Sequence, residues 1–208
     1  MNIIIQFKNL VIESLKDNKK LIIVFYALFI FTFIVSWILS ISKFGNTAIN
    51  TPVSNSTGIS AVGATELFIH NEYSGIITYI SSVFFGIFAI IMLIYNALNL
   101  GTLGALFNSA IPNGGIKYIV YLIPHGIFEI TATVLQSVAG IMLFLFIWRF
   151  IKVMRSSDTN GASQAFEKTK KVLIQSIIIM IFATILLLIA APIEAYFSVP
   201  FSDFIVGS

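Results

Sequence analysis

Ionisable and amide side chains inside apolar segments are the residues of this chain that could perform chemistry. His125, Glu129, Gln136 and Gly140 follow one another at spacings of four, seven and four residues, which places them on one face of a helix. We expect Glu194, near the end of the last apolar segment, to lie at a similar membrane depth to Glu129. Two carboxylates and an imidazole that approach one another could bind a metal ion, share a proton or accept backbone N–H groups. The candidate network comprises Asn96, Pro124, His125, Gly126, Glu129, Gln136 and Glu194.

The same residues also have structural explanations. Pro124 and Gly126 flank His125 at the expected start of a helix, where proline fits the first turn and the helix dipole favours a carboxylate such as Glu129. The amide of Asn96 could hydrogen-bond across helices. A zinc-protease helix would need a second histidine, and the sequence has no phosphate loop, dinucleotide fingerprint or Ser/His/Asp order. An enzyme is therefore not favoured, and no cofactor is predicted; a metal ion at His125, Glu129 and Glu194 remains an open alternative.

The composition indicates whether water or lipid surrounds the helices that carry the candidate residues. Hydrophobic residues make up 58% of the 208 residues and charged residues only 10%, whereas about a quarter of the residues of a soluble domain are charged. So much apolar surface, including 20 Phe, must face lipid. The absence of cysteine excludes thiolate chemistry. We predict an all-α, polytopic membrane helical bundle, and we exclude a soluble enzyme and a nucleic-acid partner, since no basic surface alternates with aromatic residues.

Four apolar segments approach the length of about 20 residues that a bilayer requires: 21–42, 75–98, 127–147 and 172–191. Between them, 99–123 is interrupted by Pro-Asn-Gly-Gly, which indicates two half-helices around a break. Lysine and arginine concentrate in 1–20 and 149–171, and the positive-inside rule places both in the cytoplasm. An even number of crossings must then separate them. We therefore predict about five spans with a broken third helix, a cytoplasmic N-terminus and an external C-terminus; the alternative leaves 99–123 as a surface loop.

The remaining segments complete a single membrane domain over 1–208. Residues 1–20 have the apolar periodicity and lysines of a helix at the cytoplasmic membrane surface. Residues 43–74 are predicted as an external loop in which 65–73 could form a short amphipathic helix. Residues 149–171 are predicted as a cytoplasmic basic loop.

The residues around His125 also carry a family resemblance. The run Leu-Ile-Pro-His-Gly-Ile-Phe-Glu-Ile at 122–130, followed by Ala139-Gly140, resembles the signature of the stage II sporulation protein M family. In that family Pro-His-Gly, two residues and Glu introduce a membrane helix. Asn96 and the sequence of Glu194 followed by Pro200 agree with it, so the resemblance extends from about Ala64 onward.

The resemblance implies a membrane anchor in a machine that remodels peptidoglycan during engulfment, although relatives also occur in organisms that form no spores. We accordingly predict a non-catalytic scaffold in the cell membrane that organises envelope partners. Two alternatives remain open: a transporter or ion pathway using His125, Glu129 and Glu194, and a membrane-embedded metal enzyme. The expected partners are the lipid bilayer, other envelope membrane proteins and, as an open alternative, further copies of the chain.

Overall fold

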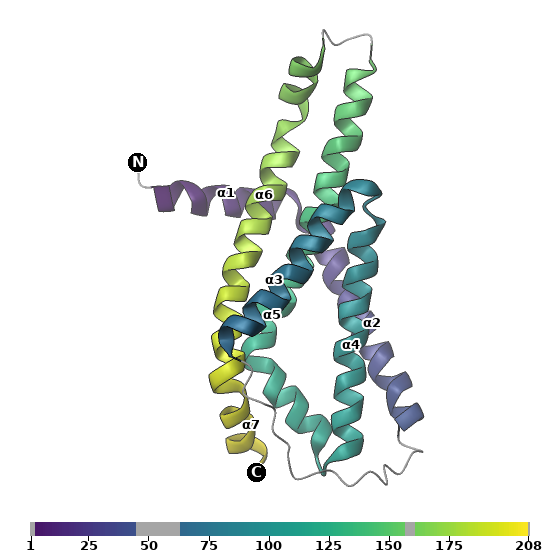
Figure 1. Ribbon diagram of the computed structural model, residues 1–208, viewed down its shortest axis with the longest axis vertical. Coiled ribbons are helices and arrows are strands. Elements are labelled where there is room, and N and C mark those ends of the chain that lie inside the picture. Colours follow the sequence, from purple (N-terminus) through teal and green to yellow (C-terminus); the bar gives the residue numbers. More distant parts are fainter. Residues whose placement is uncertain (1–2, 45–62, 157–160, 208) are drawn as a thin grey trace. The chain divides into compact units, whose positions relative to one another are not determined.

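The computed structural model describes residues 3–44, 63–156 and 161–207, which contain helices and no strands (Figure 1). The elements are α1 (Ile3–Asp17), α2 (Lys19–Phe44), α3 (Ala64–Ser81), a 3₁₀ turn (Ser82–Phe84), α4 (Ile87–Ala110), α5 (Gly114–Met154), α6 (Ala162–Ile193), a π turn (Glu194–Ser198) and α7 (Val199–Val206). The predicted all-α class is confirmed.

Four helical segments among the described residues are long and apolar enough to cross a membrane: Lys19–Lys43, Ile87–Ala110, Gly114–Met154 and Ala162–Val206. Each exceeds the roughly 20 residues that a bilayer needs. The chain is therefore a polytopic membrane protein and the bilayer is its solvent. Helix α3 is not among the four, because Glu66, His70 and Glu72 lower its hydropathy.

The apolar stretch 75–98, predicted as one span, is not one helix. Helix α3 ends at Ser81, the 3₁₀ turn follows, and α4 begins at Ile87. Gly86 adopts φ +64°, a left-handed conformation that glycine tolerates best, and its N–H donates to Ser82 O at 2.8 Å. Because the turn consists mostly of apolar residues, hydropathy alone could not reveal it.

The break predicted within 99–123 is present, but its halves belong to longer helices. Helix α4 ends at Ala110, Asn113 adopts φ +56°, and α5 begins at Gly114. The two arms pack against each other, since the Tyr118 hydroxyl donates to Leu100 O at 2.9 Å. The second half continues through Pro124, so α5 is one helix of 41 residues. The predicted half-helices are thus the adjoining ends of two candidate spans, α4 and α5, which form a helical hairpin.

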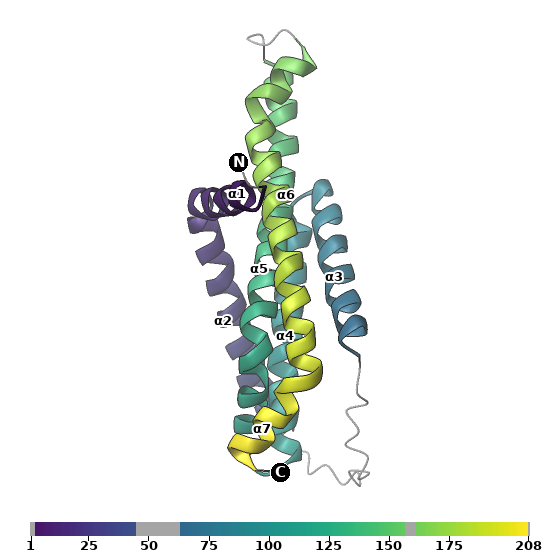
Figure 2. The same ribbon diagram turned by 90° about the vertical axis from the view of Figure 1, so that its left-hand side faces the viewer.

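Helices also replace most of the predicted basic loop, because α5 extends to Met154 and α6 begins at Ala162. Segment 65–73 is helical, within α3. Of the segment 43–74, predicted as an external loop, residues 45–62 lie outside the described residues, and the rest is helical apart from Gly63, because α2 extends to Phe44 and α3 begins at Ala64. Figure 2, which turns the view by 90°, shows α6, the π turn and α7 as a continuous ribbon.

Contacts divide the chain into two compact units, each assembled from separate segments. Unit 1 comprises Met1–Tyr26, Tyr73–Leu93 and Ala132–Ile185, and unit 2 comprises Ala27–Glu72, Ile94–Thr131 and Leu186–Ser208. Small residues permit close helix packing in both. In unit 1 the buried Ser176 hydroxyl lies 2.8 Å from Ala139 O and 3.0 Å from the Tyr79 hydroxyl. In unit 2 Gly101 lies against the backbone of Phe33, as expected where packing drives helix association in lipid.

Candidate functional site

His125, Glu129 and Glu194 lie together in unit 2. Helix α5 presents His125 and Glu129 one turn apart, and Glu194 begins the π turn after α6. One ligand atom from each side chain lies within 4.8 Å of those from the other two. His125 Nε2 and Glu129 Oε2 are 3.8 Å apart, which is longer than a hydrogen bond. We refer to these three residues as the His–Glu–Glu cluster.

The imidazole of His125 is held in one orientation. The side chain is 2% exposed, and Nδ1 lies 2.8 Å from the Ser198 hydroxyl. The Ser198 hydroxyl can donate to Ile193 O at 3.2 Å, and in the tautomer protonated at Nδ1 its oxygen accepts the Nδ1 proton. In that tautomer Nε2 carries the lone pair, and Glu129 Oε2 lies 3.8 Å from it.

Each carboxylate of the cluster receives one neutral hydrogen-bond donor. The Asn71 amide of α3 donates to Glu129 Oε1 at 3.3 Å, and the Tyr121 hydroxyl donates to Glu194 Oε1 at 3.2 Å. Both donors contact Oε1, and Glu129 Oε2 is the oxygen nearest His125. Hydrogen bonds from neighbouring side chains therefore orient both carboxylates of the cluster.

The π turn determines where Glu194 and Ser198 lie. Pro192 lies inside α6 and cannot donate a backbone hydrogen bond to the preceding turn. The widened turn Glu194–Ser198 follows, and the Ser198 hydroxyl donates to Ile193 O five residues earlier. Single π turns within α-helices are frequent at functional sites. Here the turn places Glu194 and Ser198 together against α5.

The sequence model of the stage II sporulation protein M family matches residues 21–199. The chain belongs to this family. The match confirms the resemblance noted around His125 and extends it toward the N-terminus, from Ala64 to residue 21. It includes all three residues of the His–Glu–Glu cluster and ends just beyond the π turn. No curated protein and no solved structure matches the chain.

The predicted network also includes Gln136, Asn96, Pro124 and Gly126. Gln136 is 3% exposed and lies in unit 1 against Gly75, not at the cluster. Asn96 is half-buried on α4. Pro124 and Gly126 flank His125 inside α5, which begins at Gly114, so the predicted first-turn position and its helix-dipole explanation of Glu129 are wrong.

Sequence analysis missed three residues that support the cluster: Asn71, Tyr121 and Ser198. Tyr121 lies four residues before His125, so helical spacing could have identified it. Nothing in the sequence indicated Asn71, because its contact depends on how α3 packs in unit 2. Ser198 required knowledge of the π turn.

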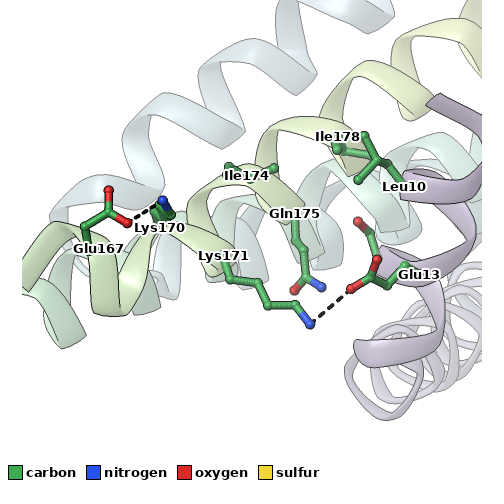
Figure 3. Close-up of a pocket in the computed structure, with 9 residues that line it drawn as sticks. Leu10, Glu13, Glu167, Lys170, Lys171, Ile174, Gln175 and Ile178 are labelled. Atoms are coloured by element: carbon green, nitrogen blue, oxygen red, sulfur yellow. Dashed lines mark ion pairs between the residues drawn. The ribbon is translucent and has the colours of Figure 1, made fainter. Parts of the chain in front are cut away.

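A second feature lies between α1 and α6 in unit 1, where a cavity of about 350 Å³ opens beside the first helix (Figure 3). Leu10, Ser14, Ile174, Gln175 and Ile178 line it together with Glu13, Glu167, Lys170 and Lys171. Each of these four charged residues belongs to an ion pair. The Lys171–Glu13 pair joins α6 to α1, whereas the Lys170–Glu167 pair lies within α6.

Lys171 is the centre of that attachment. Its Nζ lies 3.1 Å from Glu13 Oε1 and 2.9 Å from Asp17 Oδ2. Gln175 adds a hydrogen bond of 2.8 Å to the same oxygen of Asp17. The hydrogen bond from Lys171, followed by that from Gln175, holds the pKa of Asp17 below its ordinary value of 3.8. The α1–α6 contact is therefore strongest when Asp17 is ionised.

Proposed function

We propose that the protein is a non-catalytic membrane scaffold that holds cell-envelope partners together. The observation that carries the proposal is membership of the stage II sporulation protein M family over residues 21–199. The scaffold role itself comes from the resemblance described above. The apolar side chains exposed along the spanning helices, such as Phe31 and Ile127, give surfaces that other membrane helices could cover.

The arrangement of Ser198 supports a non-catalytic role. Its hydroxyl lies within hydrogen-bond distance of His125, as a nucleophile lies beside its base. However, Ser198 is fully buried, and its hydroxyl also has a backbone acceptor, Ile193 O, at 3.2 Å. We interpret the pair as a structural hydrogen bond that orients His125.

Affinity purification of the tagged chain from its native membrane tests the scaffold. We expect at least one envelope protein to remain bound in stoichiometric amount after detergent extraction and cross-linking. The matched control is an unrelated tagged polytopic protein expressed at the same level. Recovery of the chain alone, under conditions in which cross-linking succeeds for a known complex, would contradict the proposal.

We further propose that the N-terminus is cytoplasmic and the C-terminus external, an orientation that requires α3 to cross the membrane in addition to the four candidate spans. The support is the distribution of basic residues, which concentrate in 1–20 and 149–171. Helix α1 has an apolar and a polar face, as expected for a helix at a membrane surface.

The second candidate function is an ion pathway, favoured by the carboxylates of the His–Glu–Glu cluster within candidate spans. Reconstitution of the purified chain in liposomes distinguishes it from the scaffold. Uptake of protons or cations by the protein alone, abolished by Glu129→Gln, would replace the scaffold with this function. Absence of flux leaves the scaffold as the proposal.

A further inference from the structure

We propose that His125, Glu129 and Glu194 bind one divalent metal ion of the zinc class. One imidazole nitrogen and two carboxylate oxygens are ligand types that Zn²⁺ accepts. The three donors come from two helical segments that are far apart in the sequence, and their ligand atoms already lie within 4.8 Å of one another. The proposal is independent of the scaffold function.

The protonation pattern of His125 supports a metal ligand. A histidine that binds a metal uses one ring nitrogen and donates the proton of the other to a nearby acceptor. Ser198 provides that acceptor, at 2.8 Å, in the tautomer protonated at Nδ1, while its own hydroxyl can donate to Ile193 O. In this tautomer the lone pair of Nε2 lies beside Glu129 Oε2, at 3.8 Å, on a side chain that is 98% buried.

The distances fit a site that closes slightly when metal binds. Tetrahedral ligands at about 2.0–2.2 Å from zinc are separated from one another by roughly 3.4 Å. The Nε2 to Glu129 Oε2 distance is 3.8 Å, and all three ligand atoms lie within 4.8 Å. Rotation of the flexible glutamate side chains can supply a change of roughly 1 Å. Asn71 and Tyr121 can retain their bonds to the Oε1 atoms.

Charge balance gives a second reason. Glu129 and Glu194 lie close together within candidate membrane spans, where an uncompensated charge is costly. The other ionisable groups nearby are the imidazole of His125 and the hydroxyls of Tyr118 and Tyr121, of which Tyr121 donates to Glu194. A divalent cation would compensate both carboxylates at once.

Zinc titration of the purified full-length chain, stripped with a chelator, tests the site. We expect one Zn²⁺ per chain after desalting, and a higher unfolding temperature with Zn²⁺ but not with Mg²⁺. His125→Ala and Glu129→Gln should weaken binding at least 100-fold. His70→Ala, which alters the exposed histidine of α3, is the matched control and should bind as the wild type does. Ser198→Ala should weaken binding 10- to 100-fold, as expected for a residue that orients a ligand.

Cobalt provides a readout on the unaltered chain if a variant does not fold. Co²⁺ bound by nitrogen and oxygen ligands should produce a visible absorption spectrum that Zn²⁺ displaces at one equivalent. Less than 0.2 equivalents of Zn²⁺ at saturation would overturn the proposal. So would binding that survives His125→Ala in a folded protein, or that is lost in His70→Ala.

Discussion

Replacement of Gly101 by alanine tests the close packing of α2 and α4 in unit 2. A Cβ atom at Gly101 would lie 2.5 Å from Phe33 O and 2.7 Å from Ser36 Cβ. The backbone carbonyl cannot rotate away, so α2 must move outward by roughly 0.5–1 Å. That movement would also stretch the 2.8 Å bond from the Ser36 hydroxyl to Leu98 O.

The expected loss of stability follows from three contributions. Overpacking costs about 1–3 kcal/mol, and the interhelical hydrogen bond contributes about 0.6 kcal/mol. The higher helix propensity of alanine returns about 0.8–1 kcal/mol. Gly101→Ala should therefore lower the free energy of unfolding by roughly 0.6–2.8 kcal/mol.

Denaturation in mild detergent, followed by far-ultraviolet circular dichroism, measures this change. The matched control is Gly63→Ala, because no atom lies within 4 Å of the added Cβ at that position. It should change stability by less than about 0.5 kcal/mol. A Gly101→Ala protein as stable as the wild type, or more stable, would refute the described contact between α2 and α4.

Three further predictions concern topology, acid sensitivity and the His–Glu–Glu cluster. In intact cells, an impermeant thiol reagent should label Ser208→Cys but not Lys168→Cys; equal labelling would contradict the proposed orientation. Because its pKa is lowered, Asp17 stabilises the α1–α6 contact above its ordinary value of 3.8, and this contribution is lost as pH falls through the lower folded value. Proteolytic release of α1 should therefore increase only below about pH 4, and Asp17→Asn should increase it at pH 7. Glu129→Ala should cost roughly 1–3 kcal/mol by leaving the Asn71 amide unpaired; unchanged thermal stability would contradict this.

The sequence was sufficient for the class of the fold but not for its turns. Apolar composition predicted a helical membrane protein because lipid requires that every backbone polar group be paired within helices. The turn at Pro112 was predictable because it carries proline, asparagine and two glycines. The turn before Ile87 was not, because its sequence, Ser-Val-Phe-Phe-Gly, is as apolar as the helices on either side.

The two cluster residues on α5 were easier to identify than the rest of the site. A separation of four residues places His125 and Glu129 on the same helix face wherever the helix begins. This is why their pairing did not depend on the incorrect helix boundary. The same spacing argument was wrong for Gln136, which lies against Gly75 in unit 1. A helix face that continues for three turns can contact different neighbours along its length.

Proline connects the irregular backbone with the polar side chains of the cluster. Pro124 immediately precedes His125 on α5, and Pro192 lies two residues before Glu194 on α6. Each proline leaves a backbone carbonyl of the preceding turn without its usual donor. Such backbone is tolerated at membrane depth where protein surrounds it, and polar side chains have the same requirement. The burial of His125 and Ser198 shows that their sides of α5 and the π turn face protein. The same surroundings therefore allow the helices to be irregular and allow the cluster to exist.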